Sequence, residues 1–124
     1  MSALIQQWAA ANGLNLPPAT TPGQLSLTID RVRVHLVPFQ GDSILVEARV
    51  RDLPSAPAER EALLQKALAI STGRMAEAAA GPVVDPACSV LKLQSCVQAQ
   101  SSTEELDKAV SVIVNEVEFW RGVL

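Results

Sequence analysis

The side chains best suited to catalysis or metal binding are few in this sequence and lie far apart. His35 is the single histidine, and Cys88 and Cys96 are the two cysteines. The alternating pattern around His35 places it on the outward side of a strand, with no partner to make it a base or a ligand. The spacing of the cysteines matches neither a CxxC redox motif nor a zinc site. We therefore expect a surface histidine and two inert thiols; a small enzyme that uses a cysteine is the competing interpretation.

The acidic residues and the glycines also favour structural roles. Ser102 and Glu105 have the spacing of a capping box. Glu104 and Asp107 lie in the same first helical turn, where the helix dipole favours acids. The six glycines are isolated from one another, so no phosphate-binding loop is present. The sequence predicts a protein that is not an enzyme and that holds neither a metal ion nor a cofactor.

The charge balance argues against a nucleic-acid partner. The net charge is -3 and the isoelectric point is near 5.0, whereas phosphate backbones require a basic surface. The one concentration of basic residues consists of Arg31, Arg33, Arg49 and Arg51. Two interpretations stay open for these arginines: the ordinary charged outer face of a sheet, or a contact with an acidic partner segment.

Length and hydropathy indicate one domain, residues 1–124, with apolar surface that a second chain covers. The hydrophobic fraction of 48% and the mean hydropathy of +0.21 are high for a soluble monomer of this size. Residues 1–29 carry no charged side chain, but prolines, glycines and amides interrupt them, so no membrane span is expected. A basic region typical of a secretory signal is absent from the N-terminus, and we expect a cytoplasmic protein.

A helix and three strands are expected in the first half of the chain. The helix covers residues 2–12 and ends at Gly13. Residues 25–29 and 32–36 alternate between apolar and polar types, and a tight turn at 30–31 joins them, so their apolar side chains share one sheet face. A third strand covers residues 44–51, and Glu47 is expected to pair with Arg33 on the outer face.

The second half predicts two helices and two further strands. One helix covers residues 58–71. It is apolar on more than one side, as suits a helix that lies between two surfaces. Two interpretations stay open for residues 73–80: an extension of the helix, since alanine is the best helix former, or a short strand between two glycines, which is preferred. Residues 90–99 form another strand, with Leu91, Leu93, Val97 and Ala99 on one face. The closing helix covers residues 102–124. The sequence therefore predicts an α+β fold, a mostly antiparallel five-stranded sheet with three helices, in the order α-β-β-β-α-β-β-α.

Four local phrases accompany this order of elements: LTID at 27–30, LVEARVRDLP at 45–54, LLQKAL at 63–68 and EFWR at 118–121. With these phrases the chain resembles the class I type III secretion chaperones, the CesT-like family. The resemblance implies a homodimer that binds the N-terminal region of a secreted effector in extended form and keeps it export-competent. It also implies the secretion-system ATPase as a further partner. A regulatory adaptor or anti-activator on the same fold, with no catalysis, is the alternative.

Two surfaces are predicted to carry these interactions. The partner-binding residues are apolar and come from the uncharged N-terminal region: Ile5, Trp8, Leu14, Leu16, Leu25 and Leu27. The helix at residues 2–12 is too short to be stable alone, so it must dock on the sheet. Its remaining apolar surface is then available to a partner. The predicted dimer interface lies on the helix at residues 58–71 and comprises Leu63, Leu64, Ala67 and Leu68. Trp120 is assigned to the core, whereas core and interface roles stay open for Trp8.

Overall fold

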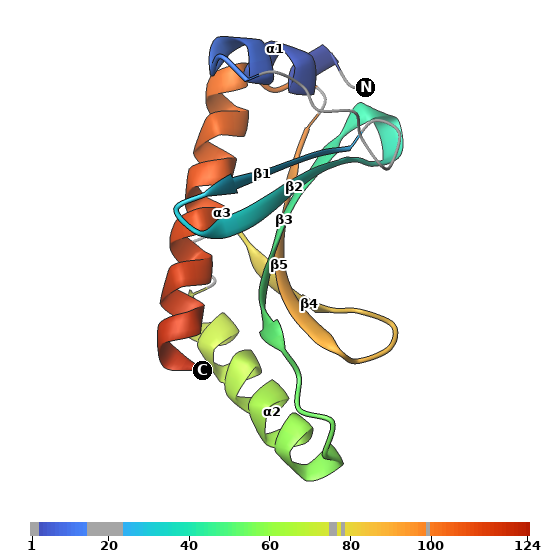
Figure 1. Cartoon of the computed structure of the whole chain (residues 1–124), viewed down its shortest axis with the longest axis vertical. Coiled ribbons are helices and arrows are strands. Elements are labelled where there is room, and N and C mark those ends of the chain that lie inside the picture. The colour runs from blue at the N-terminus through green and yellow to red at the C-terminus, as the bar shows by residue number, and fades with distance from the viewer. Residues whose placement is uncertain (1–2, 15–23, 75–76, 78, 99) are drawn as a thin grey trace.

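The computed structural model describes residues 3–14, 24–74, 77, 79–98 and 100–124. Within these residues, three α-helices and one five-stranded sheet follow one another in the predicted order, and Figure 1 shows their arrangement. The strands follow the spatial order β1-β2-β3-β5-β4, and every neighbouring pair is antiparallel. The predicted fold class is confirmed. Among the described residues, no helix combines the length and the hydropathy that a membrane crossing needs.

The first hairpin forms in the predicted register. β1 (Leu25–Ile29) pairs with β2 (Val32–Pro38) so that Leu25 lies opposite Leu36 and Ile29 lies opposite Val32. Asp30 and Arg31 form the turn, and both have positive φ values, 49° and 68°. Positive φ at both central positions is the geometry of a type I′ turn, which matches the twist of the two strands. The hairpin therefore forms although neither of the two turn positions with positive φ is occupied by glycine, the residue that adopts this conformation most easily.

β3 (Ile44–Asp52) follows a short 3-10 turn (Gln40–Asp42) and pairs with β2. The expected pairing of Glu47 with Arg33 is wrong, because Glu47 lies opposite His35 and accepts a hydrogen bond of 2.7 Å from Gln94 Nε2. Farther along, the register between β3 and β5 shifts between Arg49 and Arg51. Arg121 fixes this irregularity, since its guanidinium donates to the carbonyl oxygens of Arg49 and Val50 at 2.8 and 2.9 Å.

The preferred strand at residues 73–80 is wrong where the structure describes that segment, and the helical alternative holds for Gly73 and Arg74; residues 75, 76 and 78 lie outside the described part of the chain. α2 (Pro57–Arg74) continues beyond Ser71, and the fourth strand, β4, covers Gly81–Val84. β4 begins at Gly81, after the alanines, and its last two residues are the β-branched Val83 and Val84, which favour a strand. It is an edge strand, and such a position tolerates Pro82. β5 (Val90–Val97) lies between β3 and β4, and the predicted extension of this strand to Ala99 falls outside the described residues.

α3 (Thr103–Val123) packs its apolar stripe on β2, β3 and β5. Ser102 caps its start by accepting a hydrogen bond of 3.2 Å from the Glu105 backbone N–H. The inward side chains of β3 are all buried against this helix: Ile44, Val46, Ala48 and Val50. α1 (Ala3–Ala11) lies across the N-terminal half of α3 (Figure 1). Its main contact is therefore with α3, and the expectation that it docks chiefly on the sheet is wrong.

Gly13 ends α1 as predicted. Its φ of 67° allows the Gly13 N–H to bond the carbonyl of Ala10, and the Leu14 N–H then reaches the carbonyl of Ala9 at 2.9 Å. This pair of bonds is a Schellman motif, which satisfies the last carbonyls of a helix. The motif turns the chain so that Leu14 lies beside β1 rather than continuing along the helix axis.

Candidate functional site

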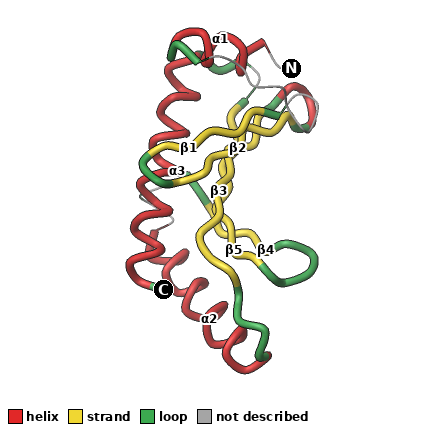
Figure 2. The backbone as a smooth tube through the Cα atoms, in the orientation of Figure 1, coloured by secondary structure: helices red, strands yellow, loops and turns green. Residues whose placement is uncertain are grey.

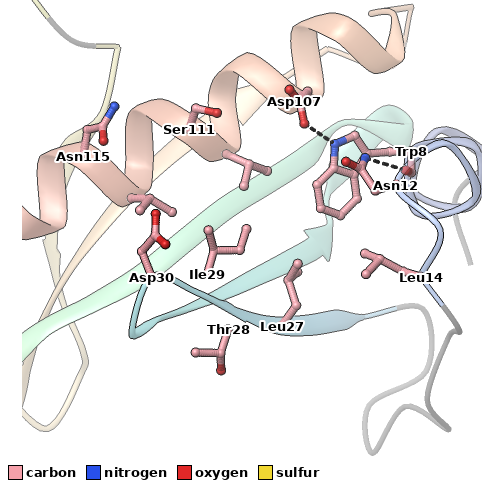
Figure 3. Close-up of a pocket in the computed structure, with 12 residues that line it drawn as sticks. Trp8, Asn12, Leu14, Leu27, Thr28, Ile29, Asp30, Asp107, Ser111 and Asn115 are labelled. Atoms are coloured by element: carbon pink, nitrogen blue, oxygen red, sulfur yellow. Dashed lines mark hydrogen bonds between the residues drawn. The ribbon is translucent and has the colours of Figure 1, made fainter.

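A groove of about 500 Å³ lies where α1, β1 and α3 meet (Figure 3). Three elements that are far apart in the sequence form it, because α1 crosses α3 above the edge strand β1. The residues that line it are Trp8, Asn12, Leu14, Leu27, Thr28, Ile29, Asp30, Asp107, Val110, Ser111, Val114 and Asn115. The groove therefore opens beside an edge of the sheet at which no other described strand pairs.

The floor of the groove is apolar, and its rim is polar. Leu27 and Ile29 point from β1 towards α3, whereas Thr28 points away (Figure 3). Val110 and Val114 face them from α3. Along the rim of α3, every fourth residue is polar: Asp107, Ser111 and Asn115. Asp30, in the β1–β2 turn, closes the end of the groove that lies near Ile29 (Figure 3).

Trp8 forms the wall between α1 and α3. Its side chain is 3% exposed, and the indole Nε1–H donates to Asp107 Oδ1 at 3.2 Å. Asn12 closes the next helical turn by donating from Nδ2 to the Trp8 carbonyl at 2.8 Å. Trp8 therefore belongs to the core and also lines the groove, while its role in an interface stays a prediction.

The structure brings together three of the residues predicted to bind a partner and places two others beneath them. Trp8, Leu14 and Leu27 line the groove, and Leu14 is 36% exposed. Ile5 is 0% exposed and Leu25 is also buried, so both support the groove from the core instead of lining it. Leu16 lies outside the described residues.

The contribution of α3 to the groove is absent from the sequence-based prediction. The sequence pattern assigns neither Val110 and Val114 nor the polar residues Asp107, Ser111 and Asn115 to a binding site. Polar residues at every fourth position are typical of the solvated side of any helix, so they give no signal of a groove. Which space this side of α3 borders depends on where α1 crosses, and the sequence pattern does not specify that crossing.

The second predicted surface lies on α2. Leu68 is 65% exposed, Leu63 and Leu64 are half-buried, and Ala67 is buried. Figure 2 shows α2 leaving the body of the molecule, so that only its C-terminal end lies close to α3. One side of its middle turns packs on the core that the chain itself provides, whereas Leu68 lies on the exposed side.

An ion pair holds that C-terminal end in place. The Arg74 guanidinium contacts the carboxylate of Glu116, which is only 5% exposed, and it lies 4.3 Å from the centre of the Phe119 ring. Glu116 also accepts a hydrogen bond of 3.3 Å from Trp120 Nε1. The hydrogen bond and the charge of Glu116 raise the pKa of Arg74. A buried charge needs such partners, so this cluster fixes α2 relative to α3.

His35 and the cysteines lie away from the groove. His35 Nδ1 lies 2.6 Å from Ser26 Oγ on the outer face of the sheet. Partial burial lowers its pKa, while the nearby carboxylate of Glu47 acts in the opposite direction. Both cysteines are exposed, and Cys88 lies in the β4–β5 turn with a φ of 52°.

Asp85 organises the turn that holds Cys88. Its carboxylate accepts hydrogen bonds of 2.6 Å from the Ser89 hydroxyl and 2.7 Å from the Val90 N–H. These bonds stabilise the ionised form and lower the pKa of Asp85. In the part of the chain that the structure describes, no three acidic, histidine or cysteine residues gather in the manner of a metal site.

Solved structures share this arrangement of helices and strands. A chain from the HopA1–SchA chaperone–effector complex matches with a TM-score of 0.69 at 15% identity, over 96% of this chain and 91% of that one. A chain from the ExsC–ExsE complex matches with a TM-score of 0.73 at 19% identity, over 100% and 97%.

A third match comes from the Yersinia pestis type III secretion chaperone SycH in complex with a stable fragment of YscM2. Its TM-score is 0.64 at 19% identity, over 96% of this chain and 98% of that one. A search of curated protein sequences found no match. A family model supplies the sequence-level evidence, since it matches residues 3–121. The chain belongs to the Tir chaperone protein (CesT) family, the kind of type III secretion chaperone that its sequence resembles.

Proposed function

We propose that this chain is a cytoplasmic chaperone that binds an extended segment near the N-terminus of a secreted effector and keeps the effector ready for export. The family match supports the chaperone role. The groove between α1, β1 and α3 is the observation that carries the proposed site, because it joins an apolar floor to the open edge of a sheet.

An extended segment suits this groove for two physical reasons. A strand that lies beside β1 can satisfy its own backbone hydrogen bonds at the sheet edge. The same strand directs every second side chain towards one face, where Leu27, Ile29 and Val114 provide an apolar surface. A segment that is disordered before it binds exposes these groups without unfolding a domain.

We further propose that the working form is a homodimer joined through α2. Leu68 is 65% exposed, whereas Ala67 is buried and Leu63 and Leu64 are half-buried against the core of the same chain. One side of α2 therefore packs on its own chain, and a second copy would remove the side that carries Leu68 from water. The secretion-system ATPase is proposed as a further partner, which receives the complex of the dimer with its effector.

The test is the affinity of the dimer for the N-terminal region of an effector encoded beside it. Calorimetry should give at least about tenfold weaker binding for Leu14→Asp and for Leu27→Asp, because each places a charge in the apolar groove. Val37→Asp is the matched control, since Val37 is half-buried on the opposite face of the sheet. Equal affinities for all four proteins would contradict the groove as the binding site.

A further inference from the structure

The charges at the groove are of one sign. Asp30 and Asp107 are the charged residues among those that line it, and Glu104 lies with Asp107 and Trp8 in the adjoining hollow of α3 and α1. Lys, Arg and His are absent from the residues that line either hollow. Residues 1–29 contain no charged side chain at all, so the N-terminal region supplies no basic side chain to neutralise these acids.

The two groove acids differ in how much of their carboxylate is engaged. Asp107 uses Oδ1 to accept from the Trp8 indole, which leaves Oδ2 available. Asp30 is exposed, and no ion pair involves it among the described residues. Both oxygens of Asp30 are therefore available to a guanidinium, which binds a carboxylate through two parallel hydrogen bonds.

The rim of α3 matches the repeat of an extended chain. Asp107, Ser111 and Asn115 follow one another at four-residue intervals, which correspond to about 6 Å along a helix axis. Alternate residues of a strand repeat at about 6.6–6.8 Å, so a strand running along α3 stays nearly in step with this rim over its whole length. The acids at the two ends of the groove then face different residues of the same bound segment.

We infer that the segment bound in this groove has apolar side chains at alternate positions and carries Arg or Lys where it passes Asp30 and Asp107. This inference rests on the proposed function and adds the chemistry of the partner segment. The apolar side chains fill the space between β1 and α3. An Arg at the turn end contacts Asp30, and a basic side chain at the other end contacts Asp107 with Glu104.

The acidic rim also selects against other occupants. An acidic segment would meet like charges at both ends of the groove, which is unfavourable at short range. The headgroups of an anionic membrane would meet the same repulsion. A purely apolar segment would fill the floor but leave the carboxylates without a partner. Charge complementarity therefore distinguishes the basic segment from these three.

Selection from a random peptide library tests the inference and does not require the effector itself. Displayed peptides of about ten residues, near the upper length of an ordinary strand, are selected on the purified wild-type protein. Binders that are also retained by the Leu27→Asp variant are discarded, so that the remaining peptides depend on the groove. The same selection is repeated on the Asp30→Asn/Asp107→Asn double variant. Asn at position 107 keeps an oxygen that can accept from Trp8.

The wild-type selection should enrich Arg and Lys beside alternating apolar residues, whereas the double variant should enrich the apolar pattern alone. Replacing the basic residue of a recovered peptide by Gln should weaken its binding to the wild type by up to about fivefold per charge, as for an exposed ion pair. The double variant should show no such difference. Glu118→Gln, which removes an acid from α3 outside the groove, should behave as the wild type.

Two outcomes would overturn the inference, and they separate it from the proposed function. Groove-dependent peptides without an excess of basic residues, or with affinities that do not respond to Asp30→Asn/Asp107→Asn, contradict the charge requirement but leave the groove as a binding site. If every peptide selected on the wild type also binds the Leu27→Asp variant, so that none remains after the discard, the groove itself is not the site. The proposed function then fails together with the inference.

Discussion

At the scale of single residues, the carboxylate of Glu116 links α2 to α3. Glu116 is the one buried charged residue among the described core positions, and it contacts Arg74 from α2 and Trp120 from the next turn of its own helix. One carboxylate therefore neutralises a guanidinium and satisfies a buried indole N–H. Removing it leaves the Trp120 N–H without its acceptor, whereas Arg74 keeps its contact with Glu77 at 2.8 Å.

Glu116→Ala should lower the free energy of unfolding by about 1–3 kcal/mol, because the buried Trp120 N–H loses its acceptor. Glu116→Gln keeps an oxygen for Trp120 and should cost less. Urea denaturation of the two variants measures the difference. Equal stability of Glu116→Ala and the wild type would contradict the structural role of this cluster.

His35 gives a pH dependence of predictable sign. Because partial burial lowers its pKa in the folded protein, the unfolded chain binds the proton more tightly. The stabilisation is present above the ordinary pKa of about 6.5 and is lost as the pH falls below it. The urea midpoint should therefore drop more for the wild type than for His35→Gln between about pH 7.5 and pH 5.5. The idea fails if both proteins lose stability equally over this range.

At the scale of elements, the contact between α1 and α3 determines which apolar residues of the N-terminal region are buried and which line the groove. Ile5 points into the core, whereas Leu14 follows the Schellman turn and remains at the groove. The sequence presents both as apolar residues of one segment. Their opposite environments follow from the left-handed conformation of Gly13 and from the crossing of α1 over α3.

Ile5→Asp should unfold the protein or lower its Tm sharply, because a charge cannot be accommodated at a fully buried position. Leu14→Asp should leave the Tm within a few degrees of the wild type. Thermal unfolding followed by circular dichroism tests both variants. If Ile5→Asp were tolerated as well as Leu14→Asp, the described docking of α1 would be wrong.

The sequence predicted some elements well because local physics determines them. The alternation of Leu25–Ile29 and Val32–Leu36 leaves one register that buries all the apolar side chains, and the structure has that register. The capped start of α3 at Ser102 depends only on neighbouring residues. By contrast, the alanines and glycines near Gly73 are compatible with both a helix and a strand. The ion pair between Arg74 and Glu116 joins residues far apart in the sequence, so no local pattern predicts it.

The candidate site was only partly predictable for the same reason. Apolar residues without nearby charges indicated Trp8, Leu14 and Leu27, which line the groove. The polar rim of α3 could not be assigned to the groove, because its position depends on a contact between the two ends of the chain. Ile5 and Leu25 share the composition of the lining residues but point to the core, and composition alone does not separate the two sets.

At the scale of the whole molecule, α2 presents a large apolar side chain that a single chain leaves exposed. Its end is anchored by Arg74, while Leu68 faces solvent in the middle of the helix. A second copy of α2 packed against the first would cover this side chain. A stable dimer of this kind buries about 1,600 Å² in total.

Leu68→Asp should shift the protein from dimer to monomer in sedimentation at micromolar concentration, with the fold of each chain retained. Retention is expected because Leu68 is already exposed in the single chain. Gln65→Asp introduces the same charge at an exposed polar position of α2 and should remain dimeric. A monomeric wild type, or a dimeric Leu68→Asp, would contradict the proposed interface.

Hydrogen exchange of the dimer with and without the N-terminal region of its effector tests the central claim most directly. The account predicts that binding slows exchange at the amides of β1, residues 25–29, and along the groove side of α3 near residues 107–115, because a bound strand covers both. The amides near Val37, where β2 pairs with β3, should be unchanged. Protection confined to α2, with β1 and α3 unaffected, would show that the effector binds elsewhere.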